Sequence, residues 1–586
     1  MSTSELKRPG SEDKTDVEVR SGLTPRPTKS RSFYLSVISI CLCVFISTVN
    51  DINFASAVPA IAASLNASTS QAYWCSTALL FSQCVAQPIC GIFAEIFGRK
   101  PAILTALAIF ALASVLAAPA NNITWLITAR AIEGLGAGSM NVCVNIIVVD
   151  LVPPRERAKW SGIVTLSGAF GLLAGVLSGS GSAQTSWRII FYVNIAIAAV
   201  AFILIVFFLK LPHAQGRNLD KLRAADWSGM AILSGSVAGL IFGIISGGSL
   251  YPWTSARIIA PLLVGGVGIV VFVLFEQHIA GRHGLGQPFI PPRLFSSRTA
   301  ASGYLLTLLH AMILWAVPFY LLYFIHVCAS KSLIAASVLL LPALLVVAPS
   351  AAIAGIFISR LSHFKYFNFA GFVLLTGGSI GLSTLRASPT TGEIIGYQLL
   401  IGIGGGMLFP GRIVAVQAAQ ERMANGDESE VRMATSLVSF ATSLGQAIGI
   451  AMGSTALQNA WDALVSKALT RGQLDSQHII VGSQAAKATE IISEMPPSIR
   501  HVYQDIAALS VARVWYVCIG LGGLGIVAAL LSRNLSLDEH ETQLRPGDVE
   551  SLDGAGVEHS NSGTPHDSLT DLENGAREKH LALETV

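Results

Sequence analysis

The sequence predicts an all-α polytopic membrane protein with 14 transmembrane helices: two pseudo-symmetric six-helix bundles and two extra helices. Of its 586 residues, 52% are hydrophobic and only 12% are charged, and the mean hydropathy is +0.60. This is too much apolar surface for a soluble domain of that length. The chain contains fourteen apolar runs, and a helix needs roughly 20 residues to cross about 30 Å of hydrocarbon. Glycine patterns that recur in the same order in both halves indicate an internal duplication.

The elements follow in a simple order. Residues 1–32 are polar, so we expect a disordered cytoplasmic arm. The first bundle, 33–211, has spans near 33–57, 71–94, 101–119, 123–150, 160–180 and 188–211. The two additional helices, within 226–277, lie near 227–247 and 257–277. The second bundle, 299–533, has spans that begin near residues 299, 331, 366, 392, 432 and 512; it includes an extracellular loop over 460–511, and a disordered cytoplasmic tail follows over 534–586.

Lys and Arg are frequent in every second loop and rare in the loops between. Because cytoplasmic loops carry an excess of Lys and Arg, we expect the basic loops and both termini to face the cytoplasm. The Asn66-Ala-Ser68 sequon falls outside, so Asn66 is a candidate for glycosylation. The basic loops include Arg99, Lys100, Arg360, Lys365, Arg412 and Arg432, whereas the opposite loops carry only Arg188, Arg257, Lys331 and Arg386.

Small residues at intervals of four allow membrane helices to pack closely. The fourth span carries Gly134-x-Gly136-x-Gly138, and a later span carries Gly402-x-Gly404. A duplicated bundle of this kind predicts a central cavity between its halves, which rocking opens alternately to each side. The candidate packing glycines are Gly171, Gly175 and Gly179 in the first half and Gly445, Gly449 and Gly453 in the second.

Ionisable residues inside the membrane are costly and are therefore functional candidates. Asp51 in the first span and Arg130 in the fourth lie at similar depths. If their helices face each other, the two can pair, and protonation of Asp51 would release the arginine. Glu133, three residues after Arg130, competes as its partner, and a permanent Arg130–Glu133 ion pair that never titrates is the alternative.

Several polar and aromatic residues could face the cavity. His310 could titrate near neutral pH, although a single histidine on an apolar helix is also a common hydrogen-bonded packing residue. Aromatic groups could stack on a planar substrate or serve as interfacial anchors. The candidates for the substrate cavity are Asn50, Asn53, Asn141, Asn145, His310, Trp315, Phe319 and Gln398.

Charged residues also gather where the second and fourth spans meet the cytoplasm. We predict that they latch the cytoplasmic side, and the alternative is simple snorkelling at the interface. The candidate gate consists of Gly91, Glu95, Gly98, Arg99, Lys100 and Asp150.

These motifs carry a family resemblance. The pattern G-x-x-x-[DE]-x-x-G-R-K, from Gly91 to Lys100, resembles the loop between helices 2 and 3 of the major facilitator superfamily of secondary transporters. The segment that begins at Arg130 is similar to its fourth-span motif R-x-x-Q-G-x-G, with Glu133 in place of Gln. Asp150-Leu-Val-Pro-Pro and Ser186-Trp-Arg resemble the 14-span drug:proton antiporters, particularly fungal multidrug and toxin efflux pumps.

Two markers of that group differ here. Its fifth span usually has Gly-Pro followed by Gly-Gly, whereas this chain has Ala174-Gly175 and Ser178-Gly179 and so lacks the proline kink. The first-span acid usually lies nine positions before the proline. In this chain the position nine residues before Pro59 is Asn50, and the acid Asp51 comes one residue later. A shift of one residue turns the side chain by about 100° around the helix axis.

The resemblance implies a proton-coupled exporter of a toxin, drug or secondary metabolite. A proton-coupled importer of a small organic solute and a transporter-like nutrient receptor are the alternatives. We expect a monomer in the plasma membrane, or else in a vacuolar or vesicle membrane, that binds a small molecule and protons. The sequence contains no hydrolase, zinc-protease or P-loop motif, so we expect no enzyme activity and no cofactor. Its charge is not concentrated on a basic face, which argues against nucleic-acid binding.

Overall fold

The structure is a computed structural model. It describes residues 30–67, 69–152, 154–211, 226–247, 251–280, 290, 292–329, 331–387, 389–423, 428–475, 479–482, 485, 491–492, 495–533 and 535. The chain divides into two units, Met1–Ser536 and Leu537–Val586, and every described residue belongs to the first. Residues 1–29, Ser68 and nearly all of the predicted tail lie outside the described residues.

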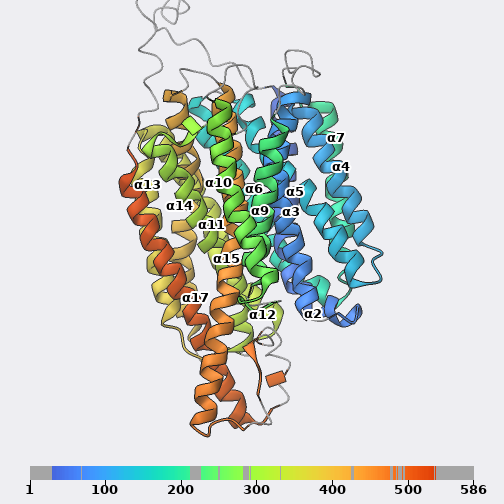
Figure 1. Ribbon diagram of the computed structural model, residues 1–586, viewed down its shortest axis with the longest axis vertical. Coiled ribbons are helices and arrows are strands. Elements are labelled where there is room, and N and C mark those ends of the chain that lie inside the picture. Colours follow the sequence, from blue (N-terminus) through green and yellow to red (C-terminus); the bar gives the residue numbers. More distant parts are fainter. Residues whose placement is uncertain are drawn as a thin grey trace, which may run out of the picture. The chain divides into compact units, whose positions relative to one another are not determined.

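Fourteen helices in the described part of the chain are long and apolar enough to span a membrane, which confirms the predicted fold class (Figure 1). Between the two bundles in the sequence come α9 (Trp227–Ser246), α10 (Ala256–Ala280) and the short η1 (Pro292–Phe295). The first bundle consists of α2 (Arg31–Ser64), α3 (Thr69–Phe97), α4 (Arg99–Ala117), α5 (Ile123–Leu151), α6 (Pro154–Gln184) and α7 (Ile189–Phe208). The second consists of α11 (Arg298–Val327), α12 (Leu333–Leu361), α13 (Phe364–Ser383), α14 (Thr391–Met423), α15 (Glu428–Thr470) and α17 (Pro497–Leu531).

The two bundles repeat the same contacts. In the first bundle α2 packs on α6 and α3 on α5, and in the second α11 packs on α15 and α12 on α14. The Lys100 ammonium donates to the Val206 carbonyl near the end of α7 at 2.8 Å, and Lys365 donates to the Leu530 carbonyl near the end of α17 at 2.8 Å. Each lysine thus stabilises carbonyls at the negative end of a helix. We call this end of the molecule, which carries Arg99, Lys100 and Lys365, the basic end.

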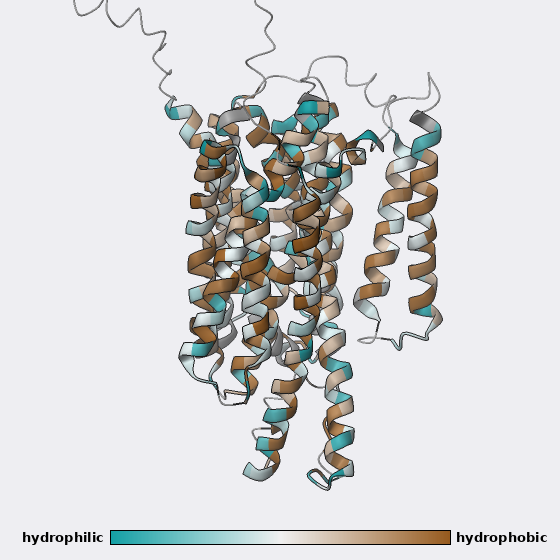
Figure 2. Ribbon diagram, turned by 90° about the vertical axis from the view of Figure 1, so that its left-hand side faces the viewer, coloured by the Kyte–Doolittle hydropathy of each residue, from teal (hydrophilic) through white to brown (hydrophobic). Residues whose placement is uncertain are grey.

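The bundles meet along two equivalent seams. The second helix of each bundle packs on the fifth helix of the other, as α3 on α15 and α12 on α6. The extra helix α9 contacts both α3 and α15, and α10 packs on α9. The outer side chains of α10 are mostly exposed, including Leu263, Val264 and Val267. Figure 2 shows hydrophobic residues along the outward faces of the helices, as a lipid environment requires.

Glycines bring the helices within each bundle into backbone contact. A Cβ atom at Gly179 would lie closer than 3.0 Å to the Asn53 carbonyl of α2, and one at Gly449 equally close to the Met312 carbonyl of α11. Gly171, Gly175, Gly445 and Gly453 are similarly crowded. The α2–α6 and α11–α15 pairs therefore depend on the absence of side chains at these positions.

The two longest helices of the second bundle far exceed the thickness of the hydrocarbon core. The 43 residues of α15 correspond to about 64 Å and the 35 residues of α17 to about 52 Å, against roughly 30 Å of hydrocarbon. Their ends extend beyond the other helices at the end opposite the basic end (Figure 1). The expected loop over 460–511 thus differs from the structure, in which α15 continues to Thr470 and α17 begins at Pro497.

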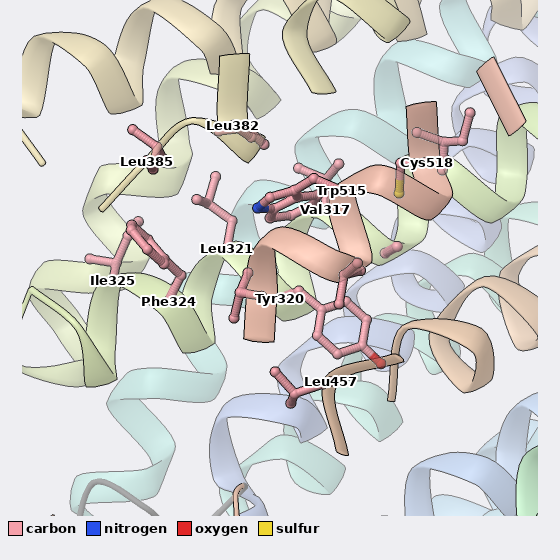
Figure 3. Packing of buried hydrophobic residues seen from close by; sticks show 14 of the residues in the cluster. Val317, Tyr320, Leu321, Phe324, Ile325, Leu382, Leu385, Leu457, Trp515 and Cys518 are labelled. Carbon is pink, nitrogen blue, oxygen red and sulfur yellow. The ribbon is translucent and has the colours of Figure 1, made fainter. Parts of the chain in front are cut away.

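Apolar packing explains why these ends are helical. Trp461 and Tyr503 are fully buried and stack with ring centroids 5.8 Å apart. The Trp461 indole donates to the Ile480 carbonyl at 2.8 Å, and the Ile480 amide donates to the Tyr503 hydroxyl at 3.0 Å. Both rings belong to a large apolar cluster that continues into the bundle, where side chains of α11, α13, α15 and α17 meet (Figure 3).

We predict that Gly179→Ala lowers the stability of the protein by about 1–3 kcal/mol, because the added methyl group overpacks the α2–α6 contact. The measurement is thermal unfolding in detergent, followed by a thiol-reactive dye that reports exposure of the cysteines, of which all but Cys41 are buried. Gly181→Ala is the matched control, because a Cβ atom there meets nothing within 4 Å. An equal loss of stability in both variants would contradict the packing argument.

Candidate functional site

A cavity of about 150 Å³ lies between the two bundles. Four helices of each bundle line it: α2, α3, α5 and α6 of the first, and α11, α12, α14 and α15 of the second. Of the residues predicted for the cavity, Asn141, Asn145 and Trp315 line it, together with Asp51.

On two of the four helix pairs, the lining follows the internal duplication position by position. On α5 and α14, with the glycine motifs aligned, the same three positions face the cavity in each bundle, and on α6 and α15 the same five positions do so. The chemistry of the pairs differs, and most of the polar members on α6 and α15 belong to the second bundle. The pairs are Asn141/Phe409, Val144/Arg412 and Asn145/Ile413, then Val164/Val438, Thr165/Ser439, Gly168/Thr442, Ala169/Ser443 and Leu172/Gln446.

Two charged residues line the cavity, one from each bundle. The Asp51 side chain, on α2, is buried, and its Oδ1 has no hydrogen-bond partner among the described residues. Arg412, on α14, is only 3% exposed; it donates to the Thr442 hydroxyl at 2.8 Å and lies 5.3 Å from the centre of the Phe409 ring. The assignment of Arg412 to a cytoplasmic loop was wrong. The helix α14 continues to Met423, which places Arg412 more than two helical turns before its end.

The structure pairs Arg130 with Glu133 and not with Asp51. The Arg130 Nη1 lies 2.9 Å from Glu133 Oε2 and 2.7 Å from the Asn50 amide oxygen. Glu133 also accepts from Ser114 at 2.6 Å, and Asn194 donates to Asn50 at 2.9 Å. We call Arg130, Glu133, Asn50, Ser114 and Asn194 the buried clasp. Asn50 therefore belongs to this network and does not line the cavity, contrary to the expectation.

The remaining cavity candidates do not line the cavity: His310, Gln398 and Asn53 are buried, and Phe319 is partly buried. His310 is 1% exposed, neither of its ring nitrogens has a partner among the described residues, and its ring lies 4.9 Å from that of Phe409. Gln398 donates to the Leu339 carbonyl at 2.9 Å. Phe319 packs against the large apolar cluster, and Asn53 is buried on α2.

Hydrogen bonds join the bundles on both sides of the cavity. Toward the basic end, Gln87 donates to Ser443 at 2.6 Å and Asn145 donates to Ser439 at 2.7 Å. Toward the opposite end, the hydroxyl groups of Ser180 and Ser337 lie 2.8 Å apart, and Ile52, Leu172 and Val176 pack into the apolar cluster of the second bundle. The two bundles thus touch each other on both sides of the cavity.

An ion-pair bridge crosses between the bundles at the basic end. Arg99 Nε lies 3.0 Å from Asp150 Oδ2, and Arg432 of α15 lies 3.6 Å from Asp150 Oδ1. Glu95 lines a small, mainly apolar cavity together with Arg99 and Arg432. Arg432 was predicted only as a loop cation and not as a gate residue, because its partner Asp150 belongs to the other bundle.

The other predicted gate residues have separate roles. Lys100 bonds a carbonyl of α7 within its own bundle. Gly98 has φ 95°, in the left-handed region that favours glycine, and it precedes α4 directly. A Cβ atom at Gly91 would lie 3.8 Å from the Ser436 hydroxyl of α15, so α3 and α15 are close at this point.

A duplicated helical bundle with a partly polar cavity at the interface of its halves is the architecture of a secondary transporter. The chain belongs to the major facilitator superfamily. The family model "Major Facilitator Superfamily" matches residues 40–237. The chain is also 33% identical over 527 residues to the MFS transporter L2 of a Phoma species, an alignment that covers 88% of this chain and 85% of that protein.

Other similar proteins are also fungal. The chain is 30% identical to the MFS-type efflux transporter pyiT of Pyricularia grisea, over 93% of this chain and 90% of that protein. It is 30% identical to the MFS-type efflux pump LUC4 of a Fusarium species, over 88% of this chain and 90% of that protein.

Among solved structures, the proton:xylose symporter XylE is similar in fold, with a TM-score of 0.53 and 13% identity over 86% of this chain and 98% of that chain. The protein is therefore a multi-pass membrane transporter and not an enzyme.

We predict that Glu133→Gln destabilises the protein by about 3–5 kcal/mol, because it leaves Arg130 buried without its counter-charge. Asp51→Asn should change stability far less, since Asp51 makes no ion pair among the described residues. Thermal unfolding of both variants in detergent tests this. A larger loss for Asp51→Asn would mean that Asp51 is the true partner of Arg130.

We predict that Arg432→Gln loosens the basic end, because it removes the second bundle's partner of Asp150. The readout is labelling of a cysteine introduced at Thr165, in the cavity wall, by a bulky polar maleimide, relative to the same protein without that cysteine. Labelling should rise severalfold. Lys100→Gln is the control, because Lys100 bonds only within its own bundle; an equal rise in both variants would argue against a bridge specific to Arg432.

Proposed function

We propose that this transporter exports a small amphipathic organic molecule, such as a toxin, drug or secondary metabolite, in exchange for protons. Its relatives of about 30% identity include proteins named as efflux transporters and efflux pumps. The single observation that carries the proposal is the cavity between the bundles, which combines apolar walls with a few polar groups.

We assign proton coupling to Asp51. Its carboxyl group lines the cavity and has an oxygen without a partner among the described residues, so its charged form gains from any donor that enters. The charged or titratable groups around it are Arg130 and Glu133 on α5 and Cys84 on α3, and Arg412 on α14 lines the same cavity. A proton and a substrate donor would compete for the same carboxylate, and that competition is what exchange requires.

Glu133 is the less suitable coupling acid. Both of its oxygens are engaged, one by Arg130 and the other by Ser114, and the residue is fully buried outside the cavity lining. In our proposal the buried clasp holds α2, α4, α5 and α7 together as one rigid body. Arg130 and Glu133 then support the coupling site without exchanging protons.

Alternating access would use the contacts on the two sides of the cavity. The Asp150 bridge would open at the basic end to admit substrate, and the Ser180–Ser337 contact would part at the opposite end to release it. The hydrogen bonds between the bundles are few, so rocking of each bundle as a unit disrupts little. By the positive-inside rule we place the basic end in the cytoplasm of a plasma-membrane monomer. Asn66 then lies outside; it is exposed and has φ 49° just after α2.

The proposal predicts lower accumulation of toxic amphipathic dyes in cells that overexpress the protein, and only while a proton gradient exists. Asp51→Asn should abolish the effect. The measurement is intracellular dye content at several external pH values, with and without an uncoupler. The control is Glu393→Gln, because Glu393 is an exposed acid in the first turn of α14 and does not line the cavity. This variant should behave as the unaltered protein.

The alternatives give different results. Accumulation that rises with expression would identify an importer. An effect that persists without a proton gradient would overturn proton coupling, and an unchanged response of Asp51→Asn would remove Asp51 from the coupling role.

A further inference from the structure

The charges of the cavity are balanced but separated. Asp51 and Arg412 both line it, yet no ion pair joins them in the described part of the chain. The other two buried charges near it, Arg130 and Glu133, neutralise each other. Among its polar groups the cavity therefore offers one charged acceptor on the first bundle and one charged donor on the second, with no net charge overall.

The internal duplication pairs each of the two charged residues with an apolar residue of the other bundle. Arg412 occupies the position that Val144 has in the first bundle, as judged from the aligned glycine motifs of α5 and α14. The glycine contacts Gly171 with Phe45 and Gly445 with Leu308 align α2 with α11, and by that alignment Leu314 is the counterpart of Asp51. The cavity would be apolar at both places without these two residues.

The cavity also has an apolar extension. A second, smaller cavity of about 20 Å³ is lined by Leu172, Trp315 and Val347, which also line the main cavity. It continues between α11, α12 and α14 along Pro318, Leu340, Leu344 and Ile401. A ligand whose polar end lies between Asp51 and Arg412 can thus extend an apolar body over Trp315.

We propose that the cavity selects amphipathic molecules without net charge, whose polar end carries both a hydrogen-bond donor for Asp51 and an acceptor for Arg412. Hydroxyl or amide groups beside a carbonyl meet this requirement. The proposal rests on the proposed function only in taking the bound molecule to be the transported substrate.

Electrostatics favours a neutral ligand over an ion. With Asp51 and Arg412 both charged, an organic cation or anion would leave one uncompensated charge in a low-dielectric cavity, which is costly. A neutral donor–acceptor head satisfies both side chains and changes no net charge. Protonation of Asp51 weakens its carboxyl group as an acceptor and leaves Arg412 as an uncompensated charge in the cavity, so the proton and the neutral ligand compete.

The test uses three fluorescent probes with one apolar body and different heads: dansylglycinamide, which is neutral, dansylglycine, an anion, and dansyl-ethylenediamine, a cation. Binding to the purified full-length protein in detergent is measured by fluorescence enhancement. We expect dansylglycinamide to bind most tightly. Asp51→Asn should shift the ratio of affinities toward dansylglycine, and Arg412→Gln should shift it toward dansyl-ethylenediamine, each by about tenfold or more.

Asn141→Ala is the matched control, because Asn141 lines the cavity without a charge; it should alter all three affinities by a similar factor. The proposal is overturned if the unaltered protein prefers the cation or the anion, if dansylglycinamide shows no saturable binding, or if the two charge variants leave the ratios unchanged. Detergent binding involves no gradient or direction of flux. A failure here is therefore distinct from a failure of proton-coupled export, which the cell experiment measures.

Discussion

The cost of a charge in hydrocarbon governs the interior of this transporter. An ionised side chain there must have a counter-charge or hydrogen-bond partners. Arg130 obtains both from Glu133 and Asn50, and its guanidinium also lies 4.5 Å from the centre of the Phe54 ring. Because these partners come from α2 and α5, the need to neutralise one arginine fixes two helices relative to each other. The same rule makes Asp51 and Arg412 notable, since each faces the cavity without the other as a direct partner.

The contacts within a bundle and those between bundles differ in kind. Within a bundle, glycines allow backbones to touch along α2–α6 and α11–α15, and such contacts resist separation because every part of the helix pair contributes. Between bundles, the polar contacts are single bonds of side chains, such as Gln87–Ser443 and Asn145–Ser439. Bonds of this type exchange readily for water or for a ligand. The structure therefore combines two closely packed bundles with an interface whose polar contacts are few among the described residues.

The sequence predicted the helices well because they depend on local properties. Length and hydropathy define a span, and the interval of four defines a glycine contact, so neither needs knowledge of the fold. The choice of partner for Arg130 was different. Glu133 and Asp51 both lie at a depth in the membrane from which they could contact Arg130. The choice depends on which residue of α2 faces α5, and that residue is Asn50 and not Asp51.

Other errors arose where a tertiary contact overrides a local signal. Arg412 was predicted in a loop because charged residues are usually found at helix ends. In the structure it lies within α14, where it donates to Thr442 of α15 and packs against the Phe409 ring. Arg432 joins the gate only through Asp150 of the other bundle, a contact with no trace in the local pattern. The 460–511 region contains polar residues throughout, but Trp461 and Tyr503 supply enough buried area to extend the helices.

Duplication and asymmetry together explain how such a protein acquires a binding site. Equivalent positions line the cavity in both bundles, so the backbone supplies the same space twice. A strictly symmetric lining would place identical groups on both sides, and two carboxylates or two guanidinium groups would repel each other in a low dielectric. Placing Asp51 on one bundle and Arg412 on the other, at positions that the repeat does not relate, avoids that repulsion. It also puts opposite charges on the two sides of the cavity, so a group that bound both residues would link the two bundles.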